Sequence, residues 1–102
     1  MTGSRYSFDA QVWEHDGPTA WFFLSLPELI TDEIDERFGH RAAGFGSLRV
    51  EVRIGATTWR TSIFPDTKRG VFVLPIKKAV RVAEQLSDGA VTEVDLHVLP
   101  DD

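Results

Sequence analysis

Residues 48–64 read LRVEVRIGATTWRTSIF. Apolar and polar side chains alternate over residues 48–54, which predicts a strand with one face against a core. A second strand is expected over residues 57–64, and Gly55-Ala56 lies between the two. Glycine at the first of two turn positions is typical of a type II′ turn, so this stretch predicts a β-hairpin.

A two-residue turn fixes which residues face each other across the hairpin. Val52 is expected opposite Trp59, on the face that packs inward. Glu51 is expected opposite Arg60 on the other face, where a cross-strand ion pair contributes at most about 1 kcal/mol. Trp59 is therefore predicted to be a core residue, and a surface ion pair is a sufficient explanation of Arg60.

The chain before this hairpin predicts another one. Apolar and polar side chains alternate over residues 6–12, which is typical of a half-buried strand. Residues 20–24 (AWFFL) form a continuous apolar run, which favours a strand covered on both faces. The turn residues Asp16-Gly17-Pro18 lie between the two strands.

A helix is expected after this hairpin. Pro27 suits its first turn, because the missing N–H of proline is no loss there. Gly39 is expected to end the helix in the left-handed conformation. The apolar side chains predicted on its buried face are Leu26, Leu29, Ile30, Ile34 and Phe38.

The chain after residue 64 repeats this pattern. A polar turn over residues 65–70 leads to a short strand over residues 71–74. Pro75 is expected to open a second helix, and Asp88-Gly89 to end it. The side chains predicted on the buried face of that helix are Ile76, Ala79, Val80, Ala83 and Leu86. A last strand is expected with Val94, Leu96 and Val98 pointing inward.

The order strand, strand, helix, strand thus occurs over residues 5–55 and again over residues 57–99. Six strands and two helices at equivalent places predict a mainly β domain of the α+β class, a closed six-stranded barrel with pseudo-two-fold symmetry. Closure is favoured because it leaves no edge strand open to aggregation. A chain of 102 residues is too short for two cores, so residues 1–102 are expected to form a single domain.

The composition is that of a soluble globular domain, with 42% hydrophobic and 26% charged residues. No apolar run approaches the roughly 20 residues that cross a bilayer, so no membrane partner is expected. Residues 1–5 lack the pattern of a secretory signal, which predicts a cytoplasmic protein. The absence of cysteine excludes disulfides, thiolate metal sites and a cysteine nucleophile.

The charges are segregated along the chain. The formal net charge of −5 disfavours nucleic acid as a partner, because phosphate groups are neutralised by lysine and arginine. Residues 28–36 carry five acidic side chains and no basic one, whereas residues 60–81 have a net charge of +5. Such runs are usually the solvated faces of helices and loops.

Three pieces of the sequence resemble a known family. They are residues 44–52 (GFGSLRVEV), 58–65 (TWRTSIFP) and 74–81 (LPIKKAVR). Together they are similar to the bacterial domain of unknown function nineteen-oh-five, over nearly the whole chain. The resemblance implies a double-split β-barrel, a fold also found in AbrB-like transition regulators and MazE-type antitoxins. It implies no established activity.

No catalytic, metal or cofactor site is predicted. Glu14-His15-Asp16 lies in a hairpin turn, where neighbouring side chains diverge and no nucleophile adjoins them. His15, His40 and His97 share no metal-ligand spacing. Trp13 has outward parity in the first strand, so it is a candidate anchor for a partner, although single exposed aromatic residues are common.

The leading functional hypothesis is a small non-catalytic binding or protein-interaction module, because no acid, base, nucleophile or metal set converges. An alternative is a DNA-binding regulator by analogy with the AbrB-like fold, against which the acidic first helix argues. A third hypothesis is an enzyme or a binder that acts on a small anionic ligand.

A site for such an anion is hypothesised at an open end of the barrel. Arg41, Lys68 and Lys77 are the candidates for its basic rim. Arg60 is a further candidate, and the helix expected to start at Pro75 points its N-terminus at the same place. The alternative interpretation is that these side chains are scattered, solvated charges.

Overall fold

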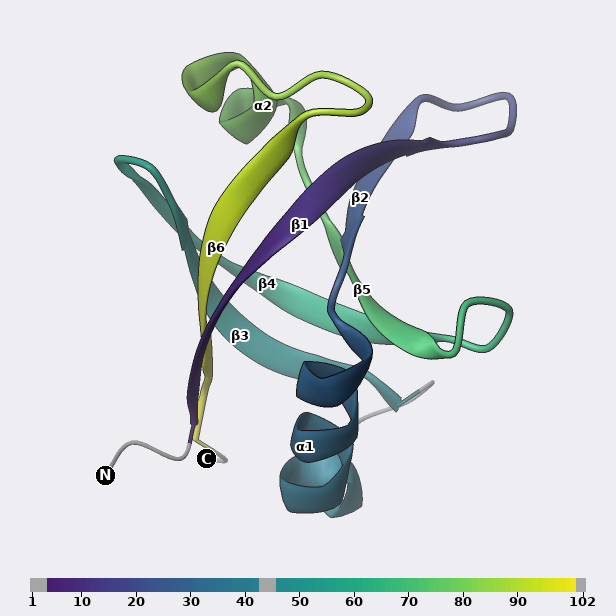
Figure 1. Cartoon of the computed structure of the whole chain (residues 1–102), viewed down its shortest axis with the longest axis vertical. Coiled ribbons are helices and arrows are strands. Elements are labelled where there is room, and N and C mark those ends of the chain that lie inside the picture. The colour runs from purple at the N-terminus through teal and green to yellow at the C-terminus, as the bar shows by residue number, and fades with distance from the viewer. Residues whose placement is uncertain (1–3, 43–45, 101–102) are drawn as a thin grey trace.

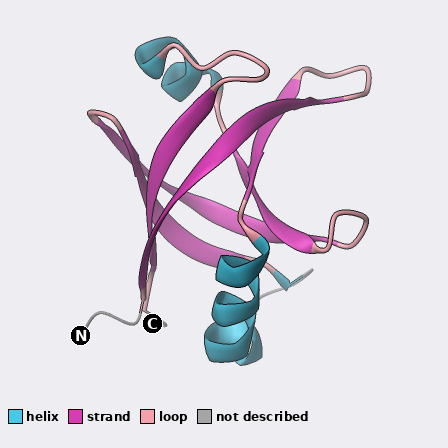
Figure 2. Ribbon diagram, in the orientation of Figure 1, coloured by secondary structure: helices cyan, strands magenta, loops and turns pink. Residues whose placement is uncertain are grey.

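In a computed structural model of the protein, which describes residues 4–42 and 46–100, six strands close into one antiparallel barrel in the order β1-β2-β5-β4-β3-β6 (Figures 1 and 2). The strands are β1 (Arg5–His15), β2 (Trp21–Ser25), β3 (Leu48–Ile54), β4 (Thr57–Asp66), β5 (Val71–Pro75) and β6 (Val91–Val98). Helices α1 (Glu28–Phe38) and α2 (Lys78–Glu84) lie at opposite ends of the barrel, and a 3-10 turn, η1 (Gly39–Arg41), follows α1. The prediction of a closed six-stranded barrel with two helices is confirmed.

Strands β1 and β4 each change partner along their length. Residues 5–11 of β1 pair with β6 and residues 12–15 pair with β2. Residues 57–63 of β4 pair with β3 and residues 64–66 pair with β5. The barrel therefore has two walls that share β1 and β4. We call β1-β6-β3-β4 the first wall and β1-β2-β5-β4 the second wall.

The β3–β4 hairpin has the register that its two-residue turn predicts. Val52 pairs with Trp59, and Glu51 pairs with Arg60 at 3.7 Å between Oε1 and Nη2. Trp59 is buried, as expected. Gly55 has a φ of +59°, which suits the first central position of a type II′ turn.

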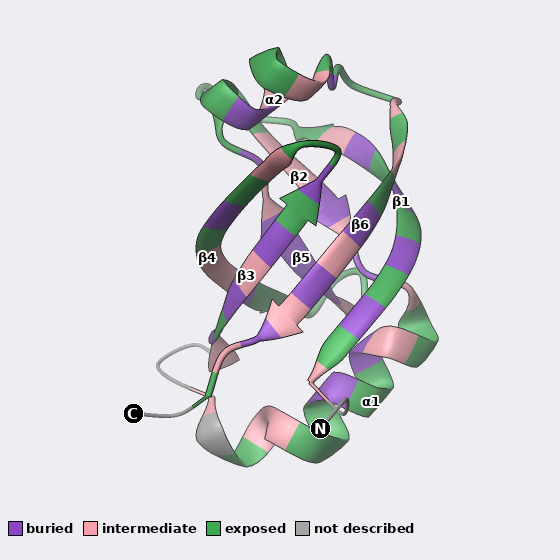
Figure 3. Cartoon of the chain, turned by 90° about the vertical axis from the view of Figure 1, so that its left-hand side faces the viewer, coloured by how far each residue is buried: buried purple, intermediate pink, exposed green. Residues whose placement is uncertain are grey.

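The core fills the inside of the barrel. Buried side chains alternate with exposed or intermediate ones along β1, β3 and β6, as Figure 3 shows. This is the pattern of strands with one face inward, so the expectation for these three strands is confirmed. The fully buried larger side chains of the core include Val12, Leu24, Ile34, Val50, Val52, Ile54, Ile63, Leu74, Val80, Val94 and Leu96.

The prediction for α1 is wrong at two positions. Leu29 is 82% exposed, whereas Thr31 is buried beside the core. The Thr31 hydroxyl accepts a hydrogen bond of 3.2 Å from the Phe72 backbone N–H, which gives this polar side chain a partner inside. Gly39 has a φ of −56°, not a left-handed one, because the chain continues directly into η1.

The prediction for α2 is wrong at its start. Pro75 ends β5 opposite Phe23, and the helix begins at Lys78. The Ile76 N–H donates to the Phe22 carbonyl at 2.8 Å, so strand pairing continues past the proline and delays the helix. The helix also ends earlier than expected, at Glu84, followed by Gln85 in the left-handed conformation. Consequently Ile76, Val80 and Leu86 are buried as predicted, whereas Ala79 and Ala83 are exposed.

Candidate binding surface

The outer side of the second wall carries aromatic and apolar side chains. Strand pairing places Trp13, Phe23 and Pro75 in one row across the wall. Val73 and Phe64 are cross-strand partners in the next row. Trp21 is 53% exposed and Phe64 39% exposed, although both are large apolar side chains. We call the six residues Trp13, Trp21, Phe23, Phe64, Val73 and Pro75 the aromatic face.

The rings of the aromatic face are held by their neighbours. Trp13 stacks on Phe23 with ring centroids 5.0 Å apart. The ring centroids of Trp21 and Phe23 are 6.3 Å apart, with the two ring planes within 12° of parallel. The indole N–H of Trp13 donates to the Ser25 hydroxyl at 2.9 Å. The rings therefore present a surface whose geometry is fixed before any partner arrives.

The β4–β5 turn also takes part in this surface. The Arg69 guanidinium lies 3.7 Å from the centre of the Trp13 ring. It also pairs with Asp66 at 3.2 Å, and the backbone N–H groups of Lys68 and Arg69 donate to the same carboxyl. Burial works to raise the pKa of Asp66, but these hydrogen bonds outweigh it and hold the pKa below its ordinary value. Asp66 thus orders the turn and orients Arg69 over the aromatic face.

Three neighbouring hollows lie along β5. The largest, which we call the groove, has a volume of about 470 Å³ and is lined by Trp21, Phe23, Phe64, Pro65, Asp66, Thr67, Val73 and Pro75. The second, which we call the basic hollow, measures about 150 Å³ and shares Trp21 and Pro75 with the groove. The third, which we call the acidic hollow, measures about 270 Å³ and shares residues 65–67 with the groove. The groove therefore lies between a basic and an acidic neighbour.

The basic hollow holds two of the four basic residues singled out in the sequence. Arg60 and Lys77 both line it, together with Trp21, Phe22 and Trp59. The Arg60 side chain is 64% exposed and is paired only loosely with Glu51, at 3.7 Å. No hydrogen bond or ion pair engages the Lys77 side chain within the described part of the chain. Arg81 does not line the hollow, but its guanidinium lies 3.9 Å from the centre of the ring of Phe22, which does.

The acidic hollow is formed where α1 meets the β4–β5 turn. Asp32 and Asp35 of α1 line it, together with Asp66. Asp66 is neutralised by Arg69, whereas no ion pair engages Asp32 or Asp35 among the residues that the structure describes. Within that part of the chain, two carboxylates without an ion-pair partner therefore lie at this end of the groove.

The other two predicted site residues lie elsewhere. Lys68 belongs to the β4–β5 turn, which precedes β5, whereas Lys77 follows it. The five residues of β5 separate them by about 16 Å at the usual rise of a strand, so one small anion does not bridge them. The Arg41 side chain and residues 43–45 lie outside the described residues, so the pairing of Arg41 with Lys68 stays a prediction. The helix expected at Pro75 starts at Lys78, so its N-terminus contributes nothing at Pro75.

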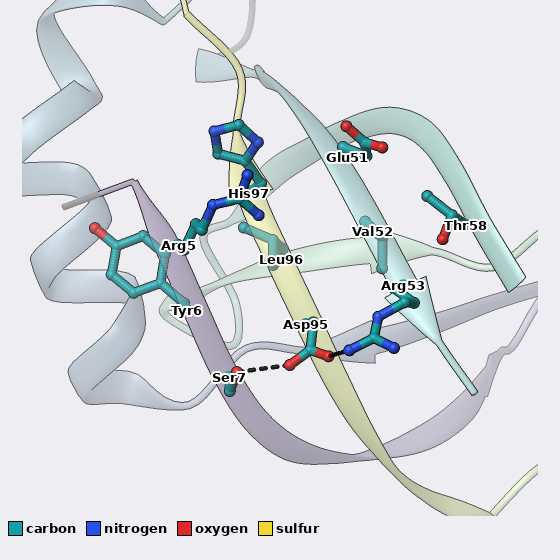
Figure 4. Close-up of a pocket in the computed structure, with 10 residues that line it drawn as sticks. All are labelled: Arg5, Tyr6, Ser7, Glu51, Val52, Arg53, Thr58, Asp95, Leu96 and His97. Atoms are coloured by element: carbon teal, nitrogen blue, oxygen red, sulfur yellow. Dashed lines mark hydrogen bonds and ion pairs between the residues drawn. The ribbon is translucent and has the colours of Figure 1, made fainter. Parts of the chain in front are cut away.

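The outer side of the first wall is polar instead. A pocket of about 370 Å³ there is lined by Arg5, Tyr6, Ser7, Glu51, Val52, Arg53, Thr58, Asp95, Leu96 and His97 (Figure 4). Asp95 lies at its centre and accepts hydrogen bonds of 2.6 Å from Ser7 and from Arg53. The Ser7 hydrogen bond first, and the Arg53 charge and hydrogen bond second, hold the pKa of Asp95 below its ordinary value. The charges of Arg53 and Asp95 in this pocket therefore neutralise each other.

The described residues offer neither a metal centre nor a spanning helix. No three histidine, aspartate or glutamate side chains of this part of the chain gather closely enough to hold a metal ion. Likewise, none of its helices has the length and apolar character that crossing a membrane requires.

Residues 8–96 match the family described as domain of unknown function DUF1905. The chain belongs to this family. The match begins within β1 and ends within β6, so it covers four complete strands, most of β1 and β6, and both helices. A search of curated proteins found no match to the chain.

Most of the aromatic face of this DUF1905 domain was missed by sequence reasoning. Trp13 was singled out by its outward parity, and it does lie on the outer side of β1. Trp21 and Phe23 were assigned to a strand covered on both faces, because a continuous apolar run usually indicates that. The available signal was the number of aromatic rings in the run, since such residues are enriched where proteins dock.

Proposed function

We propose that this DUF1905 domain is a non-catalytic protein-interaction module that docks its partner on the aromatic face. The observation that carries the proposal is the exposure of Trp21 and Phe64, which both line a groove of about 470 Å³. Contiguous exposed apolar patches on soluble domains mark interaction sites, and tryptophan dominates the energetics of such sites. Burying the exposed half of Trp21 contributes about 2–3 kcal/mol from area alone.

The charges around the groove support a protein partner over nucleic acid. Single-stranded nucleic acid also stacks on aromatic rings, but it needs a continuous basic track for its phosphates. Here Asp32 and Asp35 lie at one end of the groove and only the other end is basic. The groove, with one acidic and one basic end, therefore suits a partner that carries both charges, as protein surfaces do.

Photocrosslinking in the host cell tests this proposal. Thr67 is exposed and lines the groove, so a benzoylphenylalanine at position 67 places the reactive group beside the aromatic face. Thr58 is exposed on the first wall and is the matched control position. We expect a discrete crosslinked partner from position 67 that disappears in the Trp21→Ala background and is absent from position 58. Equal crosslinking from both positions, or crosslinking that survives Trp21→Ala, contradicts the proposal.

We further propose that the barrel is a double-split barrel built from two repeats, residues 5–55 and 57–99. Supporting this, the pairing map is unchanged when β1, β2 and β3 are exchanged with β4, β5 and β6. The β1–β2 pair then becomes β4–β5, and the β1–β6 pair becomes β4–β3. An experimental structure in which the two halves fail to superpose strand for strand contradicts this proposal.

A further inference from the structure

The hollows beside the groove differ in charge, and this difference restricts what the groove can hold. The groove runs beside β5, with the basic hollow at its Trp21 and Pro75 end and the acidic hollow at its Pro65 and Asp66 end. The five residues of β5 span about 16 Å, which is also the length of about five residues of any extended chain. A ligand that fills the groove therefore meets opposite charges at its two ends.

The closed barrel disfavours one common way of binding a peptide. Each described strand has two neighbours, so none is an outer edge strand to which a peptide could add along its whole length. Recognition on this face therefore depends on side chains that enter the hollows. The groove offers room for one or two large apolar side chains between rings that are already fixed by stacking.

Resting on the proposed function, we infer that the partner contributes an extended segment with a fixed order of side chains: a cation, a large apolar side chain and a carboxylate within about five residues. The carboxylate lies in the basic hollow between Arg60, which is loosely paired with Glu51, and Lys77, which has no ion-pair partner among the described residues. The cation lies in the acidic hollow beside Asp32 and Asp35. The apolar side chain lies against Trp21 in the groove, where desolvation strengthens both charge interactions.

This order also excludes partners. A uniformly acidic segment meets Asp32 and Asp35, and a uniformly basic one meets Arg60 and Lys77. Like charges brought together in a docked complex cost affinity and suppress wrong partners. The two ends of the groove thus set the direction in which the segment lies along β5.

Selection from a random twelve-residue peptide display library on the immobilised domain tests the inference. We expect enriched peptides to carry a lysine or arginine and an aspartate or glutamate on opposite sides of a large apolar residue. Selection on the Arg60→Glu/Lys77→Glu variant should lose the acidic position, and selection on Asp32→Asn/Asp35→Asn should lose the basic one. Trp21→Ala should lose enrichment altogether. Val91→Ala and Arg49→Ala remove an exposed apolar and an exposed basic residue of the first wall, so they should select the same peptides as the unchanged protein.

The affinity of one enriched peptide for each variant then measures how much each interaction contributes to binding. We expect Trp21→Ala to weaken binding by about tenfold or more, as for a residue at the centre of an interface. Raising the salt concentration to 1 M should weaken binding severalfold, because exposed charges are then screened. Thermal melts of each variant show that it is folded.

The outcomes separate this inference from the proposed function. The inference is overturned if the enriched peptides lack the charge order, or if selection on the Arg60→Glu/Lys77→Glu variant enriches peptides with the same charges. The proposed function does not fall with it, because that is tested separately by the crosslink from position 67. Enrichment that survives Trp21→Ala overturns both. Tighter binding of a twelve-residue thymidine oligonucleotide than of any selected peptide also overturns both, because it assigns the aromatic face to nucleic acid.

Discussion

Thr57 and Glu84 are joined by a hydrogen bond of 2.6 Å, from the Thr57 hydroxyl to Oε2 of Glu84. Thr57 begins β4 and Glu84 ends α2, so this bond fastens the second helix to the β3–β4 turn. A Cβ atom at Gly55 would clash with the same carboxylate, so a residue without a side chain leaves the space that Glu84 occupies. The turn glycine therefore serves both the hairpin and the docking of the helix.

This contact predicts energetic coupling between the two residues. In a double-mutant cycle of Thr57→Val and Glu84→Ala, we expect a coupling free energy of about 1–2 kcal/mol, as for a hydrogen bond to a charged group that is partly exposed. Urea unfolding of the four proteins measures it. Thr58→Val, at the exposed neighbouring position, should change stability by less than about 0.5 kcal/mol. Coupling near zero contradicts the contact.

The hydrogen bond between Thr31 and Phe72 should contribute measurably to the free energy of unfolding. Thr31→Val leaves the buried Phe72 N–H without its acceptor, so we expect a loss of about 1–3 kcal/mol in the free energy of unfolding. Thr31→Ser keeps the hydroxyl and should recover most of that loss. If the valine and serine variants are equally stable, the hydroxyl does not hold Phe72.

Trp59 and Arg60 are neighbours in sequence on opposite sides of the wall. Trp59→Ala removes a buried ring and should cost about 3–5 kcal/mol. Arg60→Ala removes an exposed partner of Glu51 and should cost less than about 1 kcal/mol. Melting temperatures compare the two variants directly. The reverse order would mean that the hairpin register is wrong.

Asp95 predicts a pH dependence of stability. Its pKa in the folded protein lies below the ordinary value of 3.8, because Ser7 and Arg53 stabilise the carboxylate. The stabilisation is therefore fully present above about pH 4 to 5 and is lost as the pH falls through the folded pKa. In an NMR titration, Asp95 should titrate below 3.8 and Ser7→Ala should raise its midpoint. A midpoint that Ser7→Ala leaves unchanged contradicts the hydrogen bond.

The strands could be predicted from sequence because their alternation and turn chemistry are local. Gly55-Ala56 alone sets the pairing of Val52 with Trp59. The buried face of α1 and the first residue of α2 could not be predicted, because they depend on contacts with residues far away in the sequence. Leu29 was assigned to the core by its spacing, but the Thr31 hydroxyl satisfies the Phe72 N–H and turns another side of α1 inward. Pro75 stays in β5 because Ile76 continues the pairing with β2.

The candidate binding surface could be predicted only in part, because it is assembled from residues that are far apart in the sequence. Arg60 and Lys77 were singled out as basic, and the barrel brings them to one hollow, but nothing local to either residue shows that. Trp21 and Pro75 lie 54 positions apart and meet because β2 pairs with β5. Whether an apolar run is covered on both faces depends on what packs outside the wall. In the second wall, the Arg69 side chain packs outside, over Trp13.

NMR mapping of a bound peptide shows whether partners dock on the aromatic face. An enriched peptide is titrated into the ¹⁵N-labelled domain, and the chemical-shift changes of backbone amides and indole N–H groups are assigned. If the peptide docks on the aromatic face, the largest changes fall on Trp21, Phe23 and Val73, while Ser7 and Asp95 of the first wall stay unchanged. Changes concentrated on Ser7 and Asp95, with Trp21 unaffected, would contradict docking on this face.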